Sequence, residues 1–100
     1  MLRPLEERIQ RVLAHEGLMA SRWSNGPGAV YPVHDHSYGK VLYCLEGSIQ
    51  FRMEATGHEV LLEPGDRLNI PAGAAHGAVV GSQGVVCLEA HQEAVPAATR

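Results

Sequence analysis

The apolar residues near the N-terminus repeat with the spacing of a helix. Four of them recur at positions that share one helical face: Leu5, Ile9, Val12 and Leu13. Pro4 suits the first turn, where its missing N–H costs nothing, and Gly17 favours a C-terminal stop. The pattern predicts a helix over residues 4–16. Its apolar stripe must pack against the rest of the domain or a second subunit.

From residue 18 onward, short runs of β-branched and aromatic residues alternate with Gly, Pro, Asn and Asp. Residues 48–55 alternate clearly, with Ile49, Phe51 and Met53 on one side and polar residues between them. Such runs predict strands near 18–24, 29–36, 39–46, 48–55, 58–62, 67–70, 76–80 and 84–91. Many short strands are typical of a sandwich or barrel, so we expect an all-β domain with one N-terminal helix.

Length and composition favour one domain. The chain has 100 residues, of which 45% are hydrophobic and 19% charged, as in ordinary globular proteins. We assign residues 1–17 to the helix, residues 18–94 to the β domain and residues 95–100 to a frayed tail.

Charge and cysteine usage narrow the class of protein. The net charge is −3 without a cluster of Lys or Arg, which argues against nucleic-acid binding. No apolar run approaches the ~20 residues of a membrane span, and no segment resembles a signal peptide. Cys44 and Cys87 each lie inside an apolar run and are expected to be reduced and buried. We therefore expect a cytoplasmic protein that binds neither membranes nor nucleic acids.

The candidate chemistry begins at His34-Asp35-His36, within a predicted strand. Alternate residues of a strand share a face, so the two imidazoles would lie about 7 Å apart along the backbone on one side. Two such imidazoles can converge on one metal ion. By itself this pair is weak evidence, because surface histidines are common.

Two longer patterns strengthen it: His34-x-His36-x3-Lys40-x6-Gly47 and Gly65-x5-Pro71-x-Gly73-x2-His76-x3-Val80. They resemble the two motifs of the cupin superfamily, G-x5-H-x-H-x3-4-E-x6-G and G-x5-P-x-G-x2-H-x3-N, across about residues 30–90. The resemblance implies a small single-domain cupin, a jelly-roll-like barrel also described as a double-stranded β-helix. It further implies that His34, His36 and His76 bind one divalent metal inside the barrel.

Two positions depart from the family pattern, because Lys40 replaces the carboxylate and Val80 replaces the asparagine. A protonated ammonium cannot be a ligand. Three interpretations follow. Three imidazoles alone could hold the metal, as in cupins that include iron-dependent dioxygenases. Glu89 could complete the ligand set. Alternatively, the metal site is lost and Lys40 supplies positive charge to the pocket.

The preferred hypothesis is a cupin that binds iron, manganese, nickel or zinc, all of which suit imidazole, and acts on an unknown small molecule as an oxygenase or isomerase. Lys40 would then steady an anionic substrate or a developing negative charge. The alternative is a metal-free binding or sensor module that holds a small anion at Lys40. A metal-free isomerase is a third hypothesis, but it needs a carboxylate–histidine pair that the sequence does not locate.

Two further expectations concern the surface. The remaining histidines, His15, His58 and His91, are expected to be solvated and without function. A barrel of this size leaves a sheet face and edge strands exposed, which favours a homodimer.

Overall fold

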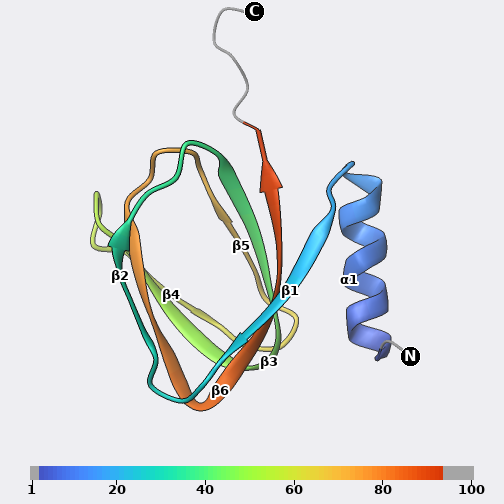
Figure 1. The fold of residues 1–100 in the computed structure, drawn as a ribbon, viewed down its shortest axis with the longest axis horizontal. Coiled ribbons are helices and arrows are strands. Elements are labelled where there is room, and N and C mark those ends of the chain that lie inside the picture. The colour runs from blue at the N-terminus through green and yellow to red at the C-terminus, as the bar shows by residue number, and fades with distance from the viewer. Residues whose placement is uncertain (1–2, 94–100) are drawn as a thin grey trace, which may run out of the picture.

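One helix and six strands form the part of the chain that this computed structural model describes, residues 3–93 (Figure 1). The elements are α1 (Pro4–His15), β1 (Ala20–Asn25), β2 (Val30–His34), β3 (Gly39–Met53), β4 (Glu59–Leu62), β5 (Arg67–Ile70) and β6 (His76–Gln92). The predicted helix and the all-β class are confirmed. The predicted tail, residues 95–100, lies outside the described residues. Within the described part, no helix is both long enough and apolar enough to cross a membrane.

The two long strands, β3 and β6, pair antiparallel from Gly39↔Gln92 to Met53↔His76. One half of this ladder is flanked by β1 on β6 and by β5 on β3. The other half is flanked by β2 on β6 and by β4 on β3. Because the long pair bends between the halves, the strands curve around a common interior, which is the expected jelly-roll-like barrel (Figure 1).

The prediction that residues 39–46 and 48–55 are separate strands is wrong, as it is for 76–80 and 84–91. Each pair is one continuous strand, and the register shifts around Gly47 where the two strands bend together. Gly47 and Gly84 have φ of 73° and 76°. A bend within a ladder and a reversal between two strands both require such glycines, so the sequence alone does not distinguish them.

Both faces of β3 are buried in its first half, which explains the continuous apolar run Val41–Leu45. Leu42 and Cys44 face the barrel core, together with Ile49, Phe51 and Cys87. Val41, Tyr43 and Leu45 face outward and pack against Ile9 and Leu13 of α1. The helix therefore covers the outside of one half of the barrel (Figure 1). Cys44 and Cys87 are free and buried, as their apolar runs indicated.

An ion pair fixes the C-terminal end of the helix to the barrel. The guanidinium of Arg67 binds both carboxylate oxygens of Glu16, at 2.6 and 2.8 Å, and also donates to the hydroxyl of Tyr43. The hydrogen bond from Arg67 lowers the pKa of Glu16. A bidentate pair of this kind restricts geometry more than a single contact does, so it orients α1 on β3 and β5.

Substitution of Gly47 tests the bend. A Cβ at this position would lie 1.9 Å from the carbonyl oxygen of Gly84, and the backbone has positive φ. We expect Gly47→Ala to lower the free energy of unfolding by more than about 3 kcal/mol. Gly65→Ala is the matched control, because φ is +93° there but nothing lies within 4 Å, and it should cost about 1–2 kcal/mol. Equal losses in urea unfolding would show that the contact with Gly84 does not constrain the fold.

Candidate metal centre and cavity

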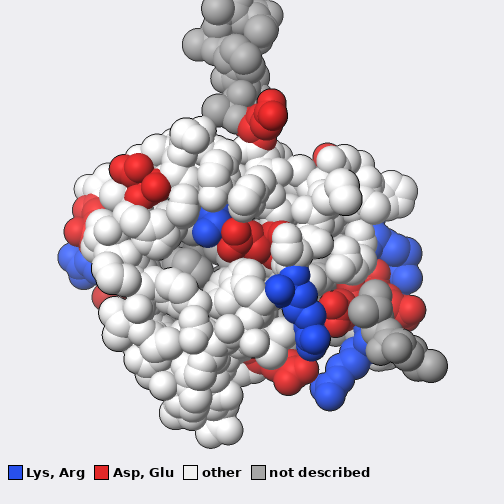
Figure 2. Space-filling view, in the orientation of Figure 1, with Lys and Arg blue, Asp and Glu red and all other residues white. Residues whose placement is uncertain are grey.

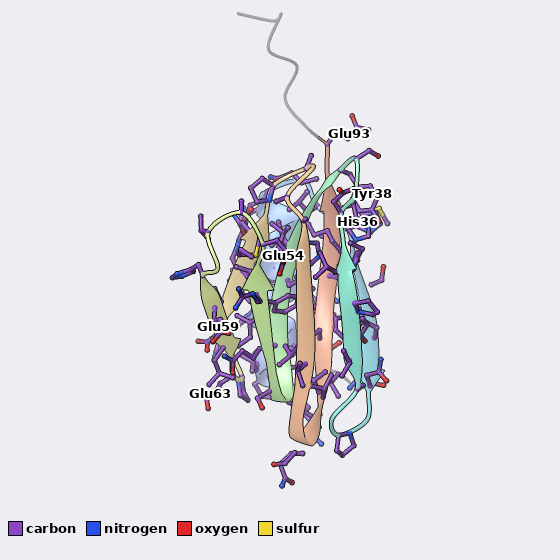
Figure 3. All side chains as sticks on the ribbon, turned by 90° about the vertical axis from the view of Figure 1, so that its left-hand side faces the viewer. His36, Tyr38, Glu54, Glu59, Glu63 and Glu93 are labelled. Carbon is purple, nitrogen blue, oxygen red and sulfur yellow. The ribbon has the colours of Figure 1, made fainter. Side chains whose placement is uncertain are left out.

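The three motif histidines come from the meeting point of β2 and β6. His34 is the last residue of β2, and its register partner is His76, the first residue of β6. His36 lies beyond the end of β2, although the sequence placed it in the same strand. Strand alternation therefore does not position His36; the connection to β3 does. His36 and Tyr38 lie together near the end of the barrel where Glu93 is also found (Figure 3).

The three rings form a tight cluster. Their centroids lie 4.7 Å apart for His34 and His36, 4.6 Å for His34 and His76, and 5.7 Å for His36 and His76. One ligand nitrogen from each ring lies within 4.8 Å of the other two. Neutral imidazole nitrogens at this separation are the donor set that transition metals bind.

Backbone carbonyls fix two of these rings. Nδ1 of His34 lies 2.7 Å from the carbonyl oxygen of Pro32, and Nδ1 of His76 lies 2.8 Å from that of Ala74. A carbonyl only accepts, so each Nδ1 carries the hydrogen and each Nε2 keeps its lone pair. Metal-binding histidines in proteins are commonly held in this way.

The third ring supplies an orphan polar atom. Nε2 of His36 is buried and has no hydrogen-bond partner among the described residues. A buried polar atom without a partner costs free energy unless something binds it. The residues present therefore fit a metal ion, which would satisfy this nitrogen together with the two Nε2 atoms of His34 and His76.

The cluster is electrostatically suited to remain neutral. Burial lowers the pKa of His36, and the positive charge of Lys40 lowers it further. Burial also lowers the pKa of His76, against the opposing effect of its hydrogen bond to Ala74. Protonation of either ring is therefore disfavoured, and the neutral form is the one that binds metal.

Beside the cluster is a cavity of about 350 Å³, within the range that small-molecule sites occupy. Its apolar wall includes Trp23, Tyr31 and Phe51. Its charged residues are Lys40 and Glu89, and His34 and His76 of the histidine cluster also line it. Figure 2 shows a hollow at the centre of this face, with a blue and a red group beside it.

Lys40 occupies the position of the family carboxylate and faces the same cavity. Its Nζ lies 3.2 Å from Oε1 of Glu89, with both side chains about 15% exposed. Trp23 donates to the same oxygen at 3.1 Å. The cluster that gathers ligand atoms among residues 3–93 contains the three histidines and not Glu89. The interpretation in which Glu89 completes the ligand set therefore has no support from the structure.

His91 contacts Glu89 and Tyr38, which the sequence did not predict. Its side chain is 57% exposed, yet Nε2 lies 3.2 Å from Oε2 of Glu89. Its ring also stacks on Tyr38 with centroids 4.0 Å apart. The signal was available, because Glu89-x-His91 has the same alternate spacing as His34-x-His36. By contrast, His15 and His58 are exposed, as expected.

Comparisons with known proteins agree with this geometry. The family model described as "Cupin domain" matches residues 22–90. Over most of its length this chain therefore belongs to the cupin family. No curated protein sequence matches it.

Several solved structures are similar. An RmlC-like cupin from Shewanella frigidimarina is 30% identical over 77% of this chain and 67% of its own, with a TM-score of 0.66. The polyketide cyclase RemF from Streptomyces resistomycificus is 28% identical over 79% of this chain, with a TM-score of 0.64. A chain from the crystal structures of the DMSP lyases RdDddP and RnDddQII is 25% identical in sequence over 77% of this chain, with a TM-score of 0.70. The chain spans 57% of the cyclase and 39% of the lyase.

The carbonyl contacts of His34 and His76 predict one tautomer for both rings. In metal-free protein above pH 7, long-range nitrogen–proton NMR correlations should show hydrogen on Nδ1 and a bare Nε2. His58, which is exposed, provides the comparison and should show the tautomer mixture of free imidazole. Hydrogen on Nε2 of His34 or His76 would contradict the assignment of these atoms as metal-facing.

Proposed function

We propose that this cupin binds one divalent transition metal through His34, His36 and His76, and that the adjoining cavity takes a small molecule. The observation that carries the proposal is the convergence of three imidazoles within 4.8 Å, two of them fixed by carbonyls and the third with an unpartnered buried nitrogen. Iron, manganese, nickel and zinc all suit this donor set.

A bound ion would supply Lewis acidity or, as iron, oxygen activation, so a metal-dependent oxygenase or isomerase is the activity we infer. The residues around it have separate roles. Trp23, Tyr31 and Phe51 exclude water and hold the apolar part of the substrate. Lys40 directs an N–H toward negative charge on the substrate. The similar lyase and cyclase structures support a small-molecule substrate.

The contacts of Lys40 favour this proposal over a metal-free module that binds an anion. An anion-binding lysine needs uncompensated charge, but the ammonium of Lys40 is balanced by the carboxylate of Glu89 at 3.2 Å. The charges of Lys40 and Glu89, the two charged side chains that line the cavity, therefore cancel. A divalent ion would make the site positive and so give an anionic substrate a reason to bind.

Two buried free thiols support a cytoplasmic location. Cys44 and Cys87 are directly opposite each other in the β3–β6 ladder, and both are buried and free of a disulfide. Reduced cysteines are usual in compartments kept reducing by thiol systems.

Elemental analysis of untagged protein tests the metal centre. We expect about one equivalent of a transition metal per chain in the parent protein, and at least a tenfold lower content in His76→Ala, because removal of one of three ligands leaves an incomplete site. His58→Ala is the matched control, since His58 is exposed and outside the cluster, and it should keep the parent's content. If neither the parent nor the control binds iron, zinc, nickel or manganese after incubation, the metal-free module becomes the better function.

We also propose that the protein is a homodimer. The outer face of one barrel half is covered by α1, whereas that of the other half exposes apolar side chains. Val30, Val79 and Leu61 lie on β2, β6 and β4 of this second half and are 67%, 50% and 52% exposed. Val30 and Val79 are register partners, and Leu61 lies on the same face beyond Gln50 of β3. Exposed apolar residues on one face of a sheet favour association through that face.

Light scattering at micromolar concentration tests the dimer. The parent should have twice the mass of the chain, and Val79→Lys should shift it to the monomer, because a buried ammonium would oppose the interface. Val12→Lys, on the exposed side of α1, should remain dimeric. A monomeric parent would exclude the proposal.

A further inference from the structure

Glu89 is an ionisable side chain on the inward face of β6, where the preceding inward-facing side chains are apolar. It follows Val85 and Cys87 at alternate positions of β6, and both of these face the buried core. Replacing a buried ion pair with apolar residues commonly leaves stability unchanged or raises it. The fold therefore does not require Glu89 and Lys40, and their position in the cavity wall points to chemistry.

The polar neighbours of Glu89 are unevenly distributed between its two oxygens. Oε1 faces two donors, Nζ of Lys40 and Nε1 of Trp23. Oε2 faces only Nε2 of His91, which donates or accepts according to the tautomer of the ring. Each carboxylate oxygen can accept two hydrogen bonds. Oε2 thus keeps acceptor capacity, and Glu89 lines the cavity where a ligand would lie.

Lys40 and Glu89 together form an acid–base arrangement. The ammonium has three N–H donors, of which the contact with Glu89 uses one. The carboxylate and the ammonium lie 3.2 Å apart. In a carbonyl compound, two carbon atoms separate the proton that a base removes from the oxygen that then gains negative charge, so the carboxylate can act on the proton while the ammonium contacts the oxygen. One small molecule can therefore contact both groups at once.

His91 connects this largely enclosed carboxylate with solvent. Glu89 is 16% exposed and His91 is 57% exposed, and their side chains are in contact. Stacking on Tyr38, which in turn stacks on His36, holds the imidazole in place. An imidazole that touches a carboxylate with one nitrogen and reaches water at the rim is suited to carry protons between them.

We propose that Glu89, Lys40 and His91 enolise a small carbonyl compound that carries hydrogen on the carbon next to its carbonyl. Glu89 removes this proton, the C–H electrons form the carbon–carbon double bond, and the carbonyl π electrons move to oxygen, where Lys40 stabilises the charge. The proton passes from Glu89 to Nε2 of His91, in the tautomer with hydrogen on Nδ1, and Nδ1 gives a proton to water. Return of a solvent proton to the carbon completes the cycle.

This inference rests on the proposed function because the same cavity must take the substrate, but the proton transfer itself uses only side chains of the chain. Deuterium exchange therefore tests it separately from metal binding. Pyruvate and hydroxyacetone, one anionic and one neutral, serve as probes in D₂O, and proton NMR follows the loss of their exchangeable hydrogens. Emission from Trp23, the single tryptophan of the chain, reports occupancy of the cavity in the same samples.

We expect at least one probe to change Trp23 emission and to exchange faster than in buffer. Glu89→Gln should slow the exchange at least ~100-fold and Lys40→Met at least ~10-fold, while the metal content stays at the parent's value. His91→Gln should slow it ~10-fold, whereas His58→Gln, an exposed histidine outside the cavity, should exchange as the parent does.

Equal exchange in the parent and in folded Glu89→Gln would overturn the relay, as would the absence of catalysed exchange with both probes. If exchange follows Glu89 in protein that binds no metal, the relay stands and the proposed metal centre fails. If metal binds through the histidines but no exchange occurs, the metal centre stands and the relay fails.

Discussion

The pairing of β3 with β6 is the constraint on which the rest of the structure depends. These strands pair along both halves of their length, with the register shifted where they bend, and every other strand attaches to one of the two halves. The bend requires backbone contact between Gly47 and Gly84, with no room for a side chain. It brings the start of β6, which carries His76, and the end of β6, which carries Glu89 and His91, to one cavity.

The cavity contains two groups of polar side chains, the histidine cluster and the Lys40–Glu89 pair, and each group is held by different contacts. Carbonyl oxygens hold His34 and His76 with Nε2 available, and burial lowers the pKa of His36 and His76. Lys40 and Glu89 instead neutralise each other on the opposing strands. A site with neutral nitrogen donors beside a paired acid and base can bind an ion without losing its proton-transfer groups.

The sequence predicted the helix and the all-β class, because hydrophobic periodicity is a local signal. The cluster of three histidines was implied by the resemblance to cupins, and the structure brings these residues together. The sequence divided β3 and β6 wrongly, since Gly47 and Gly84 carry the same signal for a bend as for a reversal. It also missed the contact of His91 with Glu89. That contact joins alternate residues of one strand, so its signal was local. What the sequence could not place is the approach of Lys40 and Trp23 to the same carboxylate, because they come from other strands, and register is a long-range property.

The cross-strand position of His34 and His76 has a mechanical consequence. β2 joins β6 through a ladder whose register is interrupted between Tyr31 and His34, so its end is held less regularly than its beginning. An ion bound by His34, His36 and His76 would link this end of β2, and the residues that follow it, to the start of β6. Tyr31 on β2 also lines the cavity. An ion held by the three histidines would therefore also fix the strand that carries Tyr31, one wall of the cavity.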